Sequence, residues 1–139
     1  MKITLDTNIW LSAIFWEGEA DKLIEKIGQN KFDIIITKEI ISEIIEVLNR
    51  ESKFQKFIDD RKQSIEELTR TILSMATLIE TKIKLDIIKE HPKDNIILEA
   101  AVDGKSKYII SYDKHLLNLI QFKKIRIISP TEFLGLIKP

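Results

Sequence analysis

Two hydrophobic patterns alternate along this chain. Short isoleucine-rich runs are apolar at successive positions, which is typical of strands buried on both faces, as in a parallel sheet. We expect strands of this kind at residues 3–5, 32–36, 108–110 and 125–128, with a further short one at 78–79.

Longer segments between these runs have the spacing of amphipathic helices. In residues 38–50, five aliphatic side chains fall on one side of the helix: Ile40, Ile41, Ile44, Ile45 and Leu48. Helices are also expected at 8–15, 20–27, 60–78, 93–102, 114–119 and 131–137, whereas 51–60 and 81–92 are expected to be loops. Alternating strands and helices with short connections predict a layered α/β fold with right-handed crossovers.

Length and composition limit the class of protein. The chain has 139 residues, 44% of them hydrophobic, which suits a single domain spanning residues 1–139. Its 22 basic residues balance 22 acidic ones and cysteine is absent, which excludes a strongly basic nucleic-acid coat, thiol catalysis and cysteine-bound zinc. No apolar run reaches the roughly 18 residues of a membrane span, and the first residues do not resemble a signal peptide. We therefore expect a cytoplasmic protein without membrane contact.

An acidic residue follows the first expected strand directly. Asp6 comes after residues 3–5 and before a helical segment. In open α/β sheets, ligands bind beyond the carboxyl ends of the strands, so Asp6 is expected at the mouth of such a crevice. Helix capping remains an open explanation, because the residues at 6–8 (Asp-Thr-Asn) are all favoured at N-caps.

Three more acids stand at comparable places. Glu43 lies beside the apolar stripe of the helix after the second strand, Asp94 begins a helix, and Asp113 follows the strand at 108–110. Taken singly, Glu43 is explained as a surface glutamate and the two aspartates as helix caps. If the strands are parallel, however, these acids and Asp6 meet at one edge of the sheet.

Crowded carboxylates repel one another unless a cation compensates their charge. Hard oxygen ligands without cysteine or a histidine cluster suit Mg²⁺ or Mn²⁺ rather than zinc. Such a site polarises a phosphodiester and lowers the pKa of a bound water, which then acts as the nucleophile. The two histidines, His91 and His115, are not expected to bind metal, and His115 is expected to lie in solvent.

In these residues the chain resembles the PIN-domain family, and in particular the VapC-type toxin ribonucleases of prokaryotic toxin–antitoxin pairs. The resemblance rests on Leu-Asp-Thr-Asn at 5–8, Glu43, and Pro-Lys-Asp-Asn at 92–95 followed by Ile-Leu-Glu-Ala at 97–100. It continues through Tyr-Ile-Ile-Ser-Tyr-Asp-Lys-His-Leu-Leu at 108–117 and Ile-Ser-Pro-Thr-Glu-Phe-Leu at 128–134. The order and spacing of these motifs, rather than any one of them, are specific.

The resemblance implies a three-layer α/β/α sandwich around a four- or five-stranded parallel sheet. It also implies Mg²⁺- or Mn²⁺-dependent, endonucleolytic cleavage of single-stranded RNA, a homodimer, and a cognate antitoxin protein as partner. By position, the metal ligands and catalytic residues are Asp6, Glu43, Asp94 and Asp113, with Asn8 and Ser111 in supporting roles.

Two positions depart from the family pattern. His91 replaces an acid that often precedes the proline, and Tyr112 replaces the glycine expected before Asp113. The second departure reshapes the approach of the substrate, so substrate preference does not follow from the resemblance.

Two other functions compete with this interpretation. A non-catalytic PIN-like module would bind RNA or a protein without cleaving it, but such a module has no reason to retain four acids that repel one another. A phosphohydrolase similar to the haloacid dehalogenases would use Asp6 as a phosphate acceptor. Those enzymes usually need a second aspartate two positions later, where this chain has Asn8.

Two further features have a structural and a functional explanation. Trp10 and Trp16 are expected to pack in the core or an interface rather than to stack on bases. Between residues 105 and 126, six basic side chains accompany a single acid, Asp113. This excess is either a track for a phosphate backbone beside the carboxylates or a solvated face.

Overall fold

The computed structural model describes residues 1–15, 19–29, 32–60, 62 and 64–137, so the expectation for Trp16 lies outside the described residues. The strands are β1 Lys2–Leu5, β2 Asp33–Thr37, β3 Thr77–Ile79, β4 Tyr108–Ile110, β5 Gln121–Phe122 and β6 Ile125–Ile128. The helices are α1 Thr7–Ile14, α2 Glu19–Gln29, α3 Lys38–Arg50, α4 Ser52–Asp60, α5 Ile65–Met75, the 3₁₀ turn η1 Pro92–Asp94, α6 Asn95–Asp103, α7 Lys114–Leu117 and α8 Pro130–Leu136.

The strands form one sheet in the order β3-β2-β1-β4-β6-β5. All neighbours pair in parallel except β5, which runs antiparallel to β6 at the edge. In the register of the central strand, Ile3 lies between Ile34 of β2 and Tyr108 of β4. The predicted parallel sheet is therefore present with five strands. The sixth was not predicted because two residues are too few to show a hydrophobic pattern.

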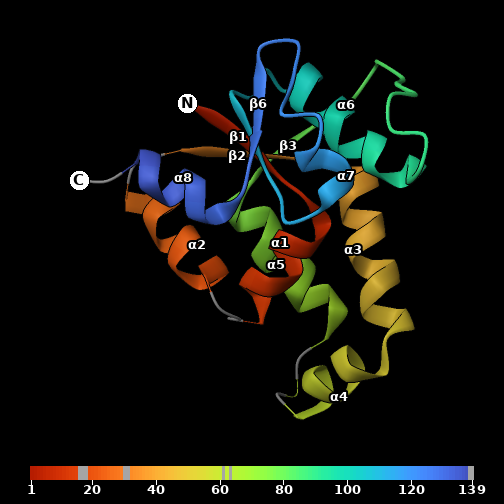
Figure 1. Ribbon diagram of the computed structural model, residues 1–139. Helices are drawn as coiled ribbons and strands as arrows, with labels where there is room; N and C mark the ends of the chain where they lie inside the picture. The colour runs from red at the N-terminus through yellow and green to blue at the C-terminus, as the bar shows by residue number, and fades with distance from the viewer. Residues whose placement is uncertain (16–18, 30–31, 61, 63, 138–139) are drawn as a thin grey trace.

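Helices cover both faces of this sheet (Figure 1). Helix α6 packs on β1, β2 and β4, and α7 lies on the same side. On the other side α2 packs between α1 and α8, while α4 extends farthest from the sheet. The predicted three-layer α/β/α arrangement is confirmed. Among the described residues, no helix combines the length and apolar character needed to cross a membrane.

The core confirms that the central strands are buried on both faces. Residues of β1, β2 and β4 are buried along nearly their whole length, and Trp10 of α1 is fully buried, as predicted. Phe133 attaches α8 to the sheet, since its ring lies 5.3 Å from that of Phe32 and 5.8 Å from that of Tyr108, in edge-to-face geometry.

Most of the predicted loop at 51–60 is helical, since α4 covers residues 52–60. The reason is tertiary, because α4 places Phe54 and Phe57 against Phe15, which directly follows α1, with ring centroids 4.9 and 4.5 Å apart. The helix predicted at 60–78 is correspondingly shorter. Ser64 caps α5 by accepting the N–H of Glu67 at 3.1 Å, and the chain turns extended in β3.

Candidate functional site

Asp6 lies where the central strand β1 ends and α1 begins. The strand pairing continues through it, because its N–H donates to the carbonyl of Ile110 at 3.1 Å. Its carboxylate also caps α1, with Oδ1 accepting the N–H of Ile9 at 2.9 Å. Only 4% of Asp6 is exposed. Strand pairing and the helix cap together hold a buried carboxylate at the carboxyl edge of the sheet.

Ser111 connects Asp6 to Asp113. Its buried hydroxyl, just beyond β4, donates to Oδ2 of Asp6 and accepts the backbone N–H of Asp113 at 2.8 Å. Asp113 in turn caps α7, since its Oδ1 accepts the N–H of His115 at 2.7 Å. These contacts are the geometry that a supporting role for Ser111 requires.

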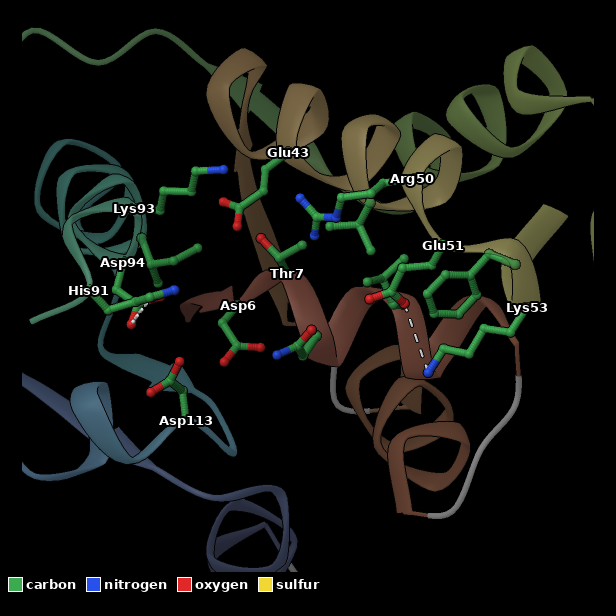
Figure 2. Close-up of a pocket in the computed structure, with 15 residues that line it drawn as sticks. Asp6, Thr7, Glu43, Arg50, Glu51, Lys53, His91, Lys93, Asp94 and Asp113 are labelled. Atoms are coloured by element: carbon green, nitrogen blue, oxygen red, sulfur yellow. Dashed lines mark ion pairs between the residues drawn. The ribbon is translucent and has the colours of Figure 1, made fainter.

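Asp94 and Glu43 reach the same space from η1 and α3. Asp94 is 8% exposed and follows Pro92, which begins the 3₁₀ turn. Glu43 is half-buried on α3, where Thr37 caps the first turn. Figure 2 shows Asp6, Asp94 and Asp113 around one space, with Glu43 facing it from α3.

All four predicted acids line a single cleft of about 420 Å³. Thr7, His91 and Lys93 lie beside the acids, whereas Arg50 and Lys53 lie on the side away from Asp6 and Asp113 (Figure 2). Glu51, 3.9 Å from Lys53, lies on that same side. The lining is completed by Asn8 and by the apolar side chains Leu11, Val47, Phe54 and Ile97. The cleft therefore has an acidic end and an end where Arg50, Lys53 and Glu51 lie beside apolar side chains.

Burial and crowding shift the ionisation of these acids. Burial is the main cause that raises the pKa of Asp6 to about 7, with Asp113 and Asp94 adding to it against the hydrogen bonds from Ser111 and Ile9. Burial likewise raises the pKa of Asp94, which His91 opposes and Asp113 reinforces. The pKa of Glu43 is also raised by burial.

The residues present fit a hard divalent cation. The four acids offer only carboxylate oxygens, the ligands that Mg²⁺ and Mn²⁺ prefer. In the described part of the chain, the buried Oδ2 of Asp94 accepts no hydrogen bond of good geometry. An unsatisfied buried oxygen and raised carboxylate pKa values are costs that a bound cation would offset.

The sequence left helix capping and a place in the cleft as alternative explanations for Asp6 and Asp113. In the structure, each of the two aspartates caps a helix and also lines the cleft. Asn8 differs from expectation. It lines the cleft but is exposed, and within the described ranges the donors to the Asp6 carboxylate are Ser111 and Ile9. The helix turn that points the Ile9 N–H at Asp6 leaves the Asn8 side chain outside.

Both histidines lie at the acidic end, which the sequence did not lead us to expect. His91 Nδ1 is 3.0 Å from Asp94 Oδ2, and His115 Nδ1 is 3.1 Å from Asp113 Oδ1. The signal available in the sequence was the spacing: His91 comes three residues before Asp94, and His115 two residues after Asp113. In a tight turn, such spacing brings the imidazole back to the carboxylate.

The loop predicted at 81–92 has no helix or strand before η1, as expected. Side chains of α6 hold this loop in place by hydrogen bonds. Asn95, Glu99 and Asp103, one helical turn apart, accept backbone N–H groups of the loop at 2.6 to 3.0 Å. The donors are Lys82, Ile83, Leu85, Ile87 and Ile88. Asn95 also donates to the Ile88 and Pro92 carbonyls, at 3.0 and 2.9 Å. These bonds satisfy the loop backbone and position His91 and Asp94.

Three of the six basic residues between 105 and 126 lie away from the carboxylates. Lys105, Lys123 and Lys124 line a separate groove beside Ile125, before β4 and β6 begin. Because the strands are parallel, this groove lies at the amino edge of the sheet and the acidic cleft at the carboxyl edge. A phosphate track directly beside the carboxylates is therefore wrong for these lysines.

Comparison with known proteins supports the predicted resemblance. A PIN-domain family model matches residues 2–115, a range that contains Asp6, Glu43, Asp94 and Asp113. Among curated protein sequences, none matches this chain.

In fold, the chain is similar to one in the crystal structure of VapBC2 from Rickettsia felis bound to a DNA fragment from their promoter. The TM-score is 0.64 at 15% identity, over 93% of this chain and 98% of that chain. Because the family model covers most of the sequence and the observed sheet agrees with it, the resemblance is confirmed: the chain belongs to the PIN-domain family.

Proposed function

We propose that this chain is a ribonuclease that cuts single-stranded RNA internally with Mg²⁺ or Mn²⁺, and that it is the toxin of a toxin–antitoxin pair. The observation that carries the proposal is the convergence of Asp6, Glu43, Asp94 and Asp113 on one cleft. These acids come from four separate places in the fold, and their burial raises the pKa of three of them.

The four carboxylates would hold the ion, which would polarise the phosphodiester and lower the pKa of the attacking water. Ser111 orients the carboxylate of Asp6 and lowers its pKa against the effect of burial. Because the pKa of Asp6 is about 7 without a cation, a metal ion bound near neutral pH would displace a proton from this residue.

The other end of the cleft supports a single-stranded substrate. Arg50 and Lys53 at this end, and Lys93 beside the acids, are cations that suit a phosphate backbone. Each is also 3.3 to 3.9 Å from a glutamate, Glu46 or Glu51, with which a phosphate would compete. Phe54 offers an aromatic ring beside Lys53, and unstacked bases stack on such rings. Bases are free for this contact in a single strand but not in a duplex.

Cleavage of labelled single-stranded RNA with Mg²⁺, Mn²⁺ or chelator tests the proposal. We expect Asp6→Asn and Asp94→Asn to lower the rate about a hundredfold or more, because each removes a negative ligand. Asp33→Asn is a matched control, since Asp33 is exposed at the amino end of β2 and lines no part of the cleft. Cleavage that persists in chelator, or at full rate in Asp94→Asn, would contradict the proposed role. A circular RNA substrate separates internal cutting from cutting at ends.

A non-catalytic module is the alternative, and calorimetry distinguishes it. If the protein binds neither Mg²⁺ nor Mn²⁺ at millimolar concentration and leaves RNA intact, the chain is such a module. Heat from metal binding that disappears in Asp94→Asn supports the nuclease instead.

The partners belong to the same proposal. The similar fold in the VapBC2 crystal structure supports a cognate antitoxin. The homodimer is proposed from the family resemblance alone. We expect expression of this chain to arrest growth, Asp6→Asn to be harmless, and the product of a small neighbouring upstream reading frame to restore growth. Light scattering after gel filtration measures the dimer. Unimpaired growth with an RNA-cleaving protein would refute the toxin assignment alone.

A further inference from the structure

We infer that His91, Asp94, Asp113 and His115 form a second kind of metal site within this cleft, one that takes a transition-metal dication such as Co²⁺, Ni²⁺ or Zn²⁺. The inference deepens the proposed function and rests on it, because Asp94 and Asp113 belong to both ligand sets. It differs in the donors, since two imidazole nitrogens replace the carboxylates of Asp6 and Glu43.

The distances between the four side chains suit a common ion. Each offers one ligand atom, and these atoms all lie within 4.8 Å of one another. Asp94 Oδ2 is 3.0 Å from His91 Nδ1 and 4.0 Å from His115 Nδ1. With bonds of about 2.1 Å, the ligand atoms of a tetrahedral ion lie roughly 3.4 Å apart. The observed separations bracket this value.

The carboxylate of Asp94, at the centre of the cluster, has a buried oxygen without an aligned hydrogen-bond donor among the described residues. Asp94 is only 8% exposed, and its Oδ2 is buried. Among the described residues, this oxygen accepts no hydrogen bond of good geometry. Its neighbours include the two imidazole Nδ1 atoms, at 3.0 and 4.0 Å, and the carboxylate of Asp113. A cation held between them would satisfy this oxygen, whereas bare imidazoles leave it without an aligned donor.

The fold holds both imidazoles in place. Their rings are nearly parallel, at 14°, with centroids 5.5 Å apart. His115 lies in the first turn of α7, where its backbone N–H donates to the Asp113 carboxylate. The bonds of Asn95 to the loop position His91. Behind His115, Nε2 lies 3.9 Å from a carboxylate oxygen of Glu90. Histidine ligands commonly turn their second nitrogen toward such a carboxylate.

Nitrogen donors change which ion binds. Imidazole favours Zn²⁺, Ni²⁺ and related ions, whereas all-carboxylate sites favour Mg²⁺ and Mn²⁺. Two imidazoles with one or two carboxylates resemble the ligand sets of catalytic zinc sites in composition. The cleft thus contains two overlapping ligand sets of different preference. An ion on the histidine set occupies Asp94 and Asp113 and thereby competes with Mg²⁺.

Titration of the chelator-treated chain with Co²⁺ tests the inference through the visible absorption of the bound ion, and calorimetry with Ni²⁺ and Zn²⁺ supports it. We expect His91→Ala and His115→Ala each to weaken binding at least tenfold, and the double variant to lose the absorption bands. Glu43→Gln is the matched control, because Glu43 belongs only to the carboxylate set. We expect it to keep Co²⁺ binding and to weaken Mg²⁺ binding.

Wild-type affinity for Co²⁺ in the double histidine variant, or no Co²⁺ absorption from the wild type at millimolar ion, would overturn the inference. The imidazoles would then serve only as ion-pair partners of the carboxylates. The side chains of His91 and His115 are 48% and 40% exposed, so their truncation leaves the core intact. If an alanine variant fails to unfold cooperatively in chelator, His91→Gln and His115→Gln replace it. RNA cleavage with Mg²⁺ is scored separately, so failure of the nuclease proposal and failure of this inference give different results.

Discussion

Replacing Asp6 by asparagine removes a buried charge while keeping its contacts. The amide oxygen can accept the N–H of Ile9, and the amide nitrogen can donate to the Ser111 hydroxyl, which now donates to Asp6. Asparagine also caps helices as well as aspartate does. We predict that, without metal, Asp6→Asn is more stable than the wild type at alkaline pH.

The magnitude follows from the two pKa values. The ordinary pKa of an aspartate is 3.8, and burial raises that of Asp6 to about 7 in the folded protein. The folded state therefore binds the proton of Asp6 more tightly than the unfolded state does. The resulting contribution to the free energy of unfolding is fully present below pH 3.8 and is lost as the pH rises through about 7. At about 1.4 kcal/mol for each pH unit between the two values, the loss is about 4 kcal/mol by pH 8.5.

Urea unfolding in chelator at several pH values from 4 to 8.5 measures this effect. The difference in free energy of unfolding between Asp6→Asn and wild type should grow with pH to about 4 kcal/mol, a midpoint shift of roughly 1 M or more. Saturating Mg²⁺ should narrow the difference, since the ion stabilises only the ionised wild-type carboxylate.

Asp103→Asn provides a control of opposite sign. The backbone N–H groups of Ile83 and Lys82 lower the pKa of the half-buried Asp103, so its contribution to stability is present at neutral pH and lost on acidification. This variant should therefore be less stable than wild type at pH 8.5 and approach it in acid. Parallel pH dependence of wild type and Asp6→Asn would refute the argument from burial.

Three further substitutions test the fold around the site. Asn95→Ala removes the hydrogen bonds to the loop and should cost about 2–4 kcal/mol in urea unfolding, with faster hydrogen exchange of the loop amides. Gly104→Ala places a Cβ 2.6 Å from a methyl carbon of Ile35 and 2.8 Å from the Ala100 carbonyl oxygen, so we expect a loss of about 1–3 kcal/mol and a lower Tm. Ile120 is an exposed, branched residue at φ 63°, a left-handed backbone conformation that asparagine adopts more easily. Ile120→Asn should therefore relieve backbone strain and raise the free energy of unfolding by about 1 kcal/mol in the same assay.

The sheet and its acidic edge were predictable because their causes are local. Isoleucine-rich runs mark strands buried on both faces, and α3 was predicted with its observed bounds from the spacing of its apolar residues. Acids placed just after parallel strands must meet at one edge, since parallel strands share a direction. The convergence of Asp6 with Asp113 follows from this rule and from the motif order typical of the family.

Contacts between distant segments determine the rest. Helix α4 is stabilised by the packing of Phe54 and Phe57 on Phe15. Phe15 is distant in the sequence, so the residues of α4 alone do not reveal this contact. The position of His91 depends on Asn95 binding the loop across several residues, and the pKa of Asp6 depends on how deeply the fold buries it. Periodicity along a chain reports which face of an element is buried. It does not report what packs on that face, and burial, ionisation and ligand geometry arise from that packing.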